Sequence, residues 1–146
     1  MKQPSRRRFA VLAGGSAVAA LVASESHAQG TNRALRVVFQ VSDVEVAKWN
    51  LTLNNVRNVQ TELPDDPPDL EVVVFGPGIG MLKADSPIAA RVAETLKNGV
   101  KVVACENTMK NMKLVYADML PNIGYVPAGV VELARKQQQG FSYIKA

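Results

Sequence analysis

The sequence predicts a single α/β domain built on a parallel β-sheet with helices on both faces. Apolar strand-like runs alternate with helix-like stretches in the order β-α-β-α-β-α-β-α-β. This alternation is typical of parallel sheets, because each crossover between parallel strands needs a helix-length connection. Once an N-terminal targeting segment is set aside, about 118 residues remain, which is enough for one domain with one core.

The first 28 residues are predicted to be an export signal. The run Ser5-Arg-Arg-Arg-Phe9 has a twin-arginine pattern, and an apolar stretch from residue 9 to 23 follows it. That stretch of about 15 residues is shorter than the roughly 20 needed to span a bilayer. Ser26-His-Ala28 fits a small-x-small cleavage site, so we expect a periplasmic chain that begins at Gln29, with residues 29–34 as a loose leader. The alternative is an ordinary secretory signal with a basic start.

Removal of this segment changes what the composition implies. It takes away four basic residues and one acidic residue, so the net charge falls from +4 to +1. The net positive charge of the full sequence therefore does not indicate nucleic-acid binding. We also expect no membrane association of the remaining chain. The only histidine, His27, leaves as well, which excludes Ser-His and Cys-His nucleophiles and zinc binding through imidazole. A single cysteine also excludes an internal disulfide.

Each expected element has its own sequence signal. Strands are predicted at 35–41, 70–75, 100–105, 123–126 and 141–145, and helices at 44–63, 86–98, from 107 onward, and 130–139. Ser86 is the expected cap of the second helix, with Pro87 as its first residue, and glycines end the second and last helices. In the first helix the expected core face is Val46, Trp49, Leu53, Val56 and Leu63. A second apolar set is suited either to a partner subunit or to loose core packing: Val44, Ala47, Leu51 and Val59.

Four loops are expected to meet beyond the carboxyl ends of the strands, where ligands bind in folds of this class. They are Ser42-Asp43, 76–83, 105–108 and 127–129. The second contains Gly76, Gly78 and Gly80, which allow unusual backbone angles and close approach of another segment. It matches neither a dinucleotide fingerprint nor a phosphate-binding P-loop, so we expect a shaped loop beside a pocket and no nucleotide or other cofactor.

Cys105 is the candidate reactive residue, because it ends an apolar strand and precedes a helix. Asn107 and Thr108 are expected to cap that helix, with Met109, Met112 and Tyr116 on one side. Backbone N–H groups at such a position favour a thiolate, the reactive form of cysteine. An ammonium group from Lys83 or Lys110 is a further candidate for lowering the thiol pKa. The alternative is a small buried hydrophobe at the end of a core strand.

Four stretches together carry a resemblance to a known family. They are Trp49-Asn50 with Asn54-Asn55-Val56, Gly76-Pro-Gly-Ile-Gly-Met-Leu82, Cys105-Glu-Asn-Thr-Met109 and Pro127-Ala-Gly-Val-Val-Glu132. The chain from residue 35 to 144 resembles the exported branch of the DsrE/DsrF-like proteins. This resemblance implies a flavodoxin-like fold, with a five-stranded, mostly parallel sheet, assembled into trimers or hexamers. In the sulfur-relay members a cysteine at the end of the third strand carries a persulfide between partner proteins, and Cys105 occupies that position.

Three interpretations of the site remain open at this stage. In the first, Cys105 is a sulfur carrier that exchanges sulfur with a donor or acceptor protein. In the second, the protein is a non-catalytic periplasmic binding module with a structural cysteine, and its adaptable pocket is lined by 76–81, Met109 and Met112. In the third, Cys105 senses redox state through an intermolecular disulfide. A metal site is not expected, because no cluster of ligands survives removal of the signal.

Overall fold

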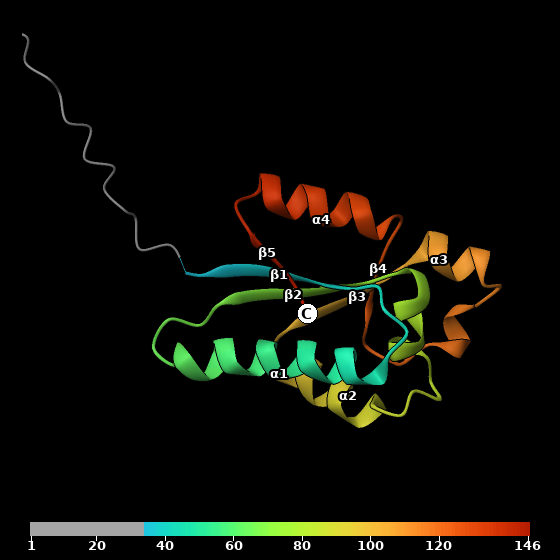
Figure 1. Ribbon diagram of the computed structural model, residues 1–146, viewed down its shortest axis with the longest axis horizontal. Helices are drawn as coiled ribbons and strands as arrows, with labels where there is room; N and C mark the ends of the chain where they lie inside the picture. Colours follow the sequence, from blue (N-terminus) through green and yellow to red (C-terminus); the bar gives the residue numbers. More distant parts are fainter. Residues whose placement is uncertain (1–33) are drawn as a thin grey trace, which may run out of the picture. The chain divides into compact units, whose positions relative to one another are not determined.

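The computed structural model describes residues 34–146 of the chain (Figure 1). The predicted export signal at 1–28 and all but the last residue of the predicted leader lie outside the described residues. No helix within residues 34–146 combines the length and the apolar character needed to cross a membrane.

The described residues form one five-stranded sheet, in the order β4-β3-β2-β1-β5. The strands are β1 (Arg36–Val41), β2 (Asp69–Val74), β3 (Lys101–Cys105), β4 (Gly124–Val126) and β5 (Ser142–Lys145). All four pairings are parallel. The predicted α/β class is confirmed, and the sheet is entirely rather than mostly parallel, because the last strand pairs with β1 in the same direction.

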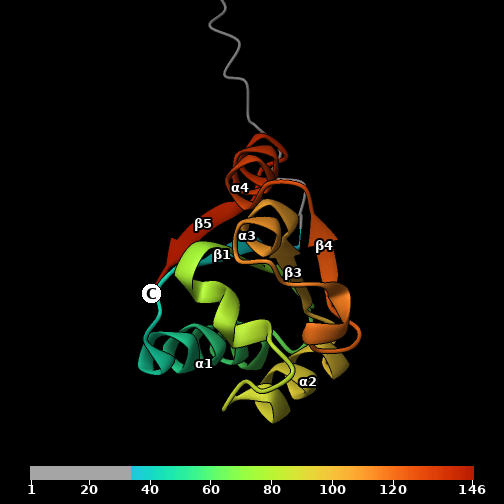
Figure 2. The same cartoon turned by 90° about the vertical axis from the view of Figure 1, so that its right-hand side faces the viewer.

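Helices cover both faces of the sheet. Helices α1 (Val46–Glu62) and α2 (Ala89–Lys97) lie on one face, and α4 (Gly129–Gln138) lies on the other (Figure 1). Short helices occupy the carboxyl edge of the strands, which faces the viewer in Figure 2. They are the six-residue α3 (Glu106–Asn111) and the 3₁₀ helices η1 (Gly76–Leu82) and η2 (Tyr116–Asp118). The predicted glycine loop is therefore a 3₁₀ helix, and the second helix begins at Ala89, two residues later than its expected first residue, Pro87.

Strand alternation divides the core into two layers. Leu70, Val72 and Val74 of β2 point toward α1 and α2, where the larger apolar cluster lies. The intervening Val73 points toward α4 and joins a small cluster with Val38, Leu133 and Phe141. The face covered by α4 therefore has far less apolar packing than the opposite face.

Helix α1 buries a narrower stripe than its pattern predicts. Trp49, Leu53 and Val56 are buried as expected, and Val59 packs against their cluster. Val46 is 37% exposed and Leu63 is only half-buried, so the two ends of the predicted core face lie outside the core. Val46 is the first residue of the helix and Leu63 follows its last residue, so both lie at the ends of α1.

A buried ion pair joins β2 to α4 on the thinly packed face. The Lys136 ammonium lies 2.6 Å from Glu71 Oε2 and 3.7 Å from Glu132 Oε1, and it also sits 4.8 Å from the centre of the Phe141 ring. Glu71 is 2% exposed, and its Oε1 has no hydrogen-bond partner among the described residues. Burial raises the pKa of the Glu71 carboxyl above its usual range, against the lowering effect of Lys136.

Candidate functional site

Cys105 lies at the end of β3 with its side chain on the α4 side of the sheet. The neighbouring Val102 and Ala104 point into the opposite core, and Cys105 alternates with them. The residue is 5% exposed, yet it belongs to neither apolar cluster. Its Sγ lies 4.0 Å from the Pro127 carbonyl oxygen, which can accept a weak hydrogen bond from the neutral thiol. The sulfur is therefore buried next to a backbone carbonyl and outside the two apolar clusters.

The hydroxyl of Thr108 connects the glycine segment to the cysteine. Gly76 has φ +55°, in the left-handed region that favours glycine, and its N–H donates to Thr108 Oγ1 at 2.9 Å. A hydroxyl that accepts this bond keeps its own proton free to donate to another acceptor. Hydrogen bonding by the Thr108 side chain is one of the effects that lower the pKa of the Cys105 thiol.

Hydrogen-bond donors converge on the Cys105 sulfur from two segments. They are the Thr108 hydroxyl and the backbone N–H groups of Gly129, Thr108 and Asn107. Burial raises the pKa of the Cys105 thiol, but these hydrogen bonds outweigh burial and hold that pKa below its ordinary value. The arrangement stabilises a negative charge on sulfur with neutral donors and without a histidine.

Helix α3 differs from its predicted form. It begins at Glu106, with Cys105 as the capping residue, because the helical backbone starts directly after the strand. Thr108 therefore lies inside the helix, where its side chain bonds to Gly76 instead of capping. The helix ends at Asn111, so Met112 and Tyr116 do not continue a buried face, and they are 47% and 60% exposed.

The glycine segment owes its shape to close packing. A Cβ at Gly78 would lie 2.7 Å from the Val41 carbonyl oxygen at the end of β1, and one at Gly80 would lie 3.2 Å from the Trp49 ring. Met81 was expected to line a pocket, but it is fully buried in the core beneath the segment. The segment thus packs closely on β1 and α1, and its first residue contacts Thr108.

The two candidate ammonium groups occupy other surroundings. Lys83 forms an ion pair with Asp85 at 3.2 Å, and its backbone forms a bridge with Met119. Lys110 is exposed on α3. Neither lysine is among the groups that lower the pKa of the Cys105 thiol. Asn107 contributes its backbone N–H, which also donates to the Pro127 carbonyl at 3.2 Å, while its side chain is exposed.

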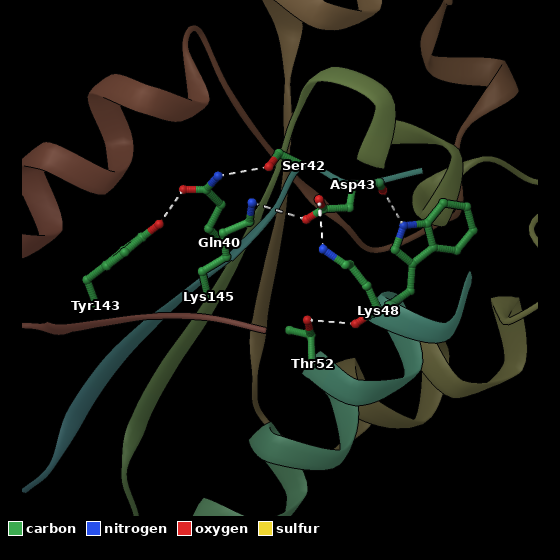
Figure 3. A network of polar contacts seen from close by, with 8 residues as sticks. Gln40, Ser42, Asp43, Lys48, Thr52, Tyr143 and Lys145 are labelled. Carbon is green, nitrogen blue, oxygen red and sulfur yellow. Dashed lines mark hydrogen bonds and ion pairs between the residues drawn. The ribbon is translucent and has the colours of Figure 1, made fainter. Parts of the chain in front are cut away.

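A polar network fixes the first of the four loops (Figure 3). The carboxylate of Asp43 lies 3.2 Å from the Lys48 ammonium and 3.3 Å from the Lys145 ammonium, so it joins α1 to the end of β5. Hydrogen bonding to Lys48, together with Lys145, holds the pKa of Asp43 below its ordinary value. The indole of Trp49 donates to the Asp43 carbonyl oxygen at 2.7 Å. The network therefore anchors the loop after β1 to α1 and β5.

The four predicted loops do meet at the carboxyl edge. Gly78 packs on the end of β1, Gly76 bonds to Thr108, and Asn107 bonds to Pro127. The residue that sequence analysis missed is Gly129, whose backbone N–H is among the groups that lower the pKa of the Cys105 thiol. Its position in the fourth predicted loop, 127–129, was the sequence signal that could have identified Gly129 as a site residue. A Cβ there would lie 2.8 Å from Phe75 Cδ1, so only glycine allows the start of α4 to approach this closely.

No metal-binding group of three or more acidic, histidine or cysteine side chains occurs within residues 34–146.

These features define a class: a flavodoxin-like α/β protein with one cysteine at the carboxyl edge of a parallel sheet, held among hydrogen-bond donors. The chain belongs to the DsrE/DsrF-like family, whose model matches residues 35–146. Comparison with curated proteins gave no match.

Solved structures share this fold. A protein of unknown function from Methanobacterium thermoautotrophicum, MTH1491, is 31% identical, with a TM-score of 0.73 over 77% of this chain and 99% of that chain. BT1422 of Bacteroides thetaiotaomicron, also of unknown function, is 12% identical, with a TM-score of 0.63 over 76% and 94% of the two chains. The ychN protein of E. coli is 12% identical, with a TM-score of 0.63 over 78% and 100%. The last two comparisons support the fold alone.

Proposed function

We propose that the protein is a sulfur carrier in which the thiolate of Cys105 accepts a sulfur atom as a persulfide. The observation that carries this proposal is the convergence of hydrogen-bond donors on a buried sulfur that belongs to neither apolar cluster. A cysteine kept only for packing needs no such donors, because the neutral thiol is a weak acceptor. Membership of the DsrE/DsrF-like family, which is associated with sulfur relay, supports the same chemistry.

The reaction needs no external oxidant or reductant. The Cys105 thiolate attacks the outer sulfur of a donor such as thiosulfate, the donor's S–S bond breaks, and sulfite leaves with the electron pair. The product is a persulfide anion on Sγ. An acceptor thiolate then attacks the terminal sulfur, and the Cys105 thiolate leaves unchanged. In both steps the Thr108 hydroxyl and the Gly129 N–H stabilise the negative charge on sulfur.

One observation favours a second candidate function. Cys105 is 5% exposed, so a large donor reaches its sulfur only if the covering residues move aside. A binding module with a structural cysteine has no such requirement. We keep it as the alternative, with an exposed part of the carboxyl edge as the binding surface.

Sulfur loading of the native protein tests the proposal. The protein is incubated with thiosulfate or polysulfide, and intact mass is measured for the wild type and for Cys105→Ser. We expect the wild type to gain one reducible sulfur atom and the variant to gain none. The same chain in urea is the control for thiol reactivity. Loading in urea but not in the native state would reject the carrier and leave the binding module.

We further propose that the protein works in the periplasm as a homo-oligomer. The Ser5-Arg-Arg-Arg-Phe9 pattern supports export, and exposed Val44 and Leu51 supply apolar surface for a partner subunit. Replacement of Arg6 and Arg7 by lysine is expected to retain the protein in the cytoplasm, as judged by cell fractionation. Light scattering is expected to give a mass of several chains, and a monomer would contradict the assembly.

A further inference from the structure

The segment that follows α3 exposes several large apolar side chains. Met112 is 47% exposed, and Val115 and Tyr116 are each 60% exposed. Single exposed apolar residues are ordinary on protein surfaces, but three within five residues mark a surface suited to binding. We call Met112, Val115 and Tyr116, together with Lys110 and Lys113, the α3 patch.

The α3 patch borders a groove of about 290 Å³. The groove is lined by Glu106, Met109, Lys110, Leu114, Val115 and Tyr116. Two contacts hold the Tyr116 ring at the side of the groove. The ring packs edge-to-face on Tyr125 with 4.6 Å between ring centres, and the Tyr116 hydroxyl donates to Glu106. Met109 is 4% exposed and belongs to the main core, so the floor of the groove is continuous with the body of the domain.

The acidic and basic side chains of this segment differ in whether they have partners. The carboxylate of Glu106 accepts the Tyr116 hydroxyl, and that of Asp118 accepts the Val115 N–H at 2.8 Å. Lys110 and Lys113 are exposed, and neither takes part in an ion pair among residues 34–146. The surface thus offers two ammonium groups that have no ion-pair partner among residues 34–146 beside apolar side chains, while its two carboxylates keep their charge and accept hydrogen bonds from neutral donors.

The patch is separated from the candidate reactive cysteine along the chain only by the short helix α3. Helix α3 begins directly after Cys105 and has six residues, so its far end is about 9 Å along the axis from the cysteine. A partner seated on the groove would therefore place its own residues within reach of the carboxyl edge, where Thr108 and Gly129 face Cys105.

We propose that the α3 patch is the docking surface for the protein that exchanges sulfur with Cys105, and that this partner presents apolar side chains flanked by Asp or Glu. The inference rests on the proposed function for the identity of the partner. Charge complementarity selects an acidic segment, because a basic one would face unpaired Lys110 and Lys113. The groove accepts the apolar side chains.

Two synthetic peptides test the docking surface. One has Leu and Phe flanked by Glu around a central Ser, and the other has Lys in place of each Glu. Binding to the protein is measured by fluorescence anisotropy at low and high salt. We expect the acidic peptide to bind about tenfold more tightly at low salt, and salt to weaken it. Two double variants are each expected to reduce binding of the acidic peptide: Met112→Ser with Val115→Ser, and Lys110→Glu with Lys113→Glu.

Matched controls separate the patch from general surface effects. Val130→Ser removes an apolar side chain that is 64% exposed on α4, and Lys97→Glu reverses an exposed lysine on α2. Neither is expected to change binding. Equal affinity for the two peptides, or equal loss in controls and patch variants, would overturn the docking surface. A change in sedimentation of the protein alone in the Met112/Val115 variant would assign the patch to a second copy and would also overturn it.

A version of each peptide with Cys in place of Ser distinguishes docking from sulfur chemistry. If sulfur-loaded protein transfers sulfur faster to the acidic peptide, both proposals are supported. If the acidic peptide binds but Cys105 takes up no sulfur from thiosulfate, the surface stands and the carrier function fails. If Cys105 is loaded but transfers equally to both peptides, the carrier stands and the docking surface is wrong.

Discussion

The backbone N–H of Gly76 donates to the hydroxyl oxygen of Thr108 at 2.9 Å, and hydrogen bonding by the same Thr108 side chain helps to lower the pKa of the Cys105 thiol. This bond links the ends of β2 and β3 through one side chain. Because Gly76 holds a left-handed backbone conformation, its N–H orients the hydroxyl before any reaction begins. Thr108 thus acts as an oriented donor to the thiolate.

Thr108→Val is expected to slow alkylation of Cys105 by iodoacetamide at neutral pH. Valine keeps the shape of threonine but removes the donor to the thiolate, and a hydrogen bond to a charged group contributes about 1.5 kcal/mol or more, roughly tenfold in thiolate population. The rate of alkylation against pH should shift to higher pH. Thr61→Val is the matched control, because Thr61 bonds to Arg57 on the exposed side of α1. An unchanged profile in Thr108→Val would show that the hydroxyl does not act on the sulfur.

Gly78→Ala is expected to destabilise the protein more than Gly80→Ala. The Cβ at position 78 would lie 2.7 Å from the Val41 carbonyl oxygen, a backbone atom in β1, whereas at position 80 it would lie 3.2 Å from the Trp49 side chain. Backbone in a central strand cannot move aside, so we expect a loss of about 1–3 kcal/mol in the free energy of unfolding for Gly78→Ala. Urea unfolding of both variants checks this. The reverse order would show that the 3₁₀ helix can shift away from β1.

Glu71→Gln is expected to weaken the pH dependence of stability. Burial raises the pKa of Glu71 in the folded state, despite the Lys136 ammonium and with Glu132 nearby, so the folded protein binds this proton more tightly than the unfolded chain. The wild-type free energy of unfolding should therefore fall as pH rises from about 4 through the folded-state pKa, by at most about 1.4 kcal/mol per pH unit.

That fall should be absent in Glu71→Gln and retained in Glu62→Gln, which changes an exposed residue at the end of α1. Urea unfolding at several pH values between about 4 and 7 measures it. Identical slopes in the wild type and Glu71→Gln would show that Glu71 titrates alike in the folded and unfolded states.

The alternation of elements and the position of Cys105 could be predicted from the sequence, because both depend on local pattern. Continuous apolar runs such as Leu70 to Phe75 predict buried parallel strands, and the run before Cys105 places the thiol at a strand end. Parallel strands bring all their carboxyl ends to one edge, so the meeting of the four loops followed from topology alone.

The contacts that shape the site could not be predicted in this way. Thr108 has the local signature of a helix cap, but its partner is Gly76, 32 residues earlier. Met81 follows a glycine-rich run that suggests an open loop, yet packing under η1 buries it completely. The closeness of Gly129 to Phe75 depends on how α4 docks on the sheet. Each is a long-range relationship that residue spacing does not encode.

The most direct measurement is the rate of iodoacetamide alkylation of native Cys105 as a function of pH, with the unfolded chain in urea as reference. We expect the native thiol to react without unfolding, with a rate that rises at a pH below that of the unfolded chain, because donors from Thr108 and Gly129 stabilise the thiolate. Reaction only after unfolding, or a native profile shifted to higher pH, would contradict a thiolate at this site and make Cys105 a structural residue.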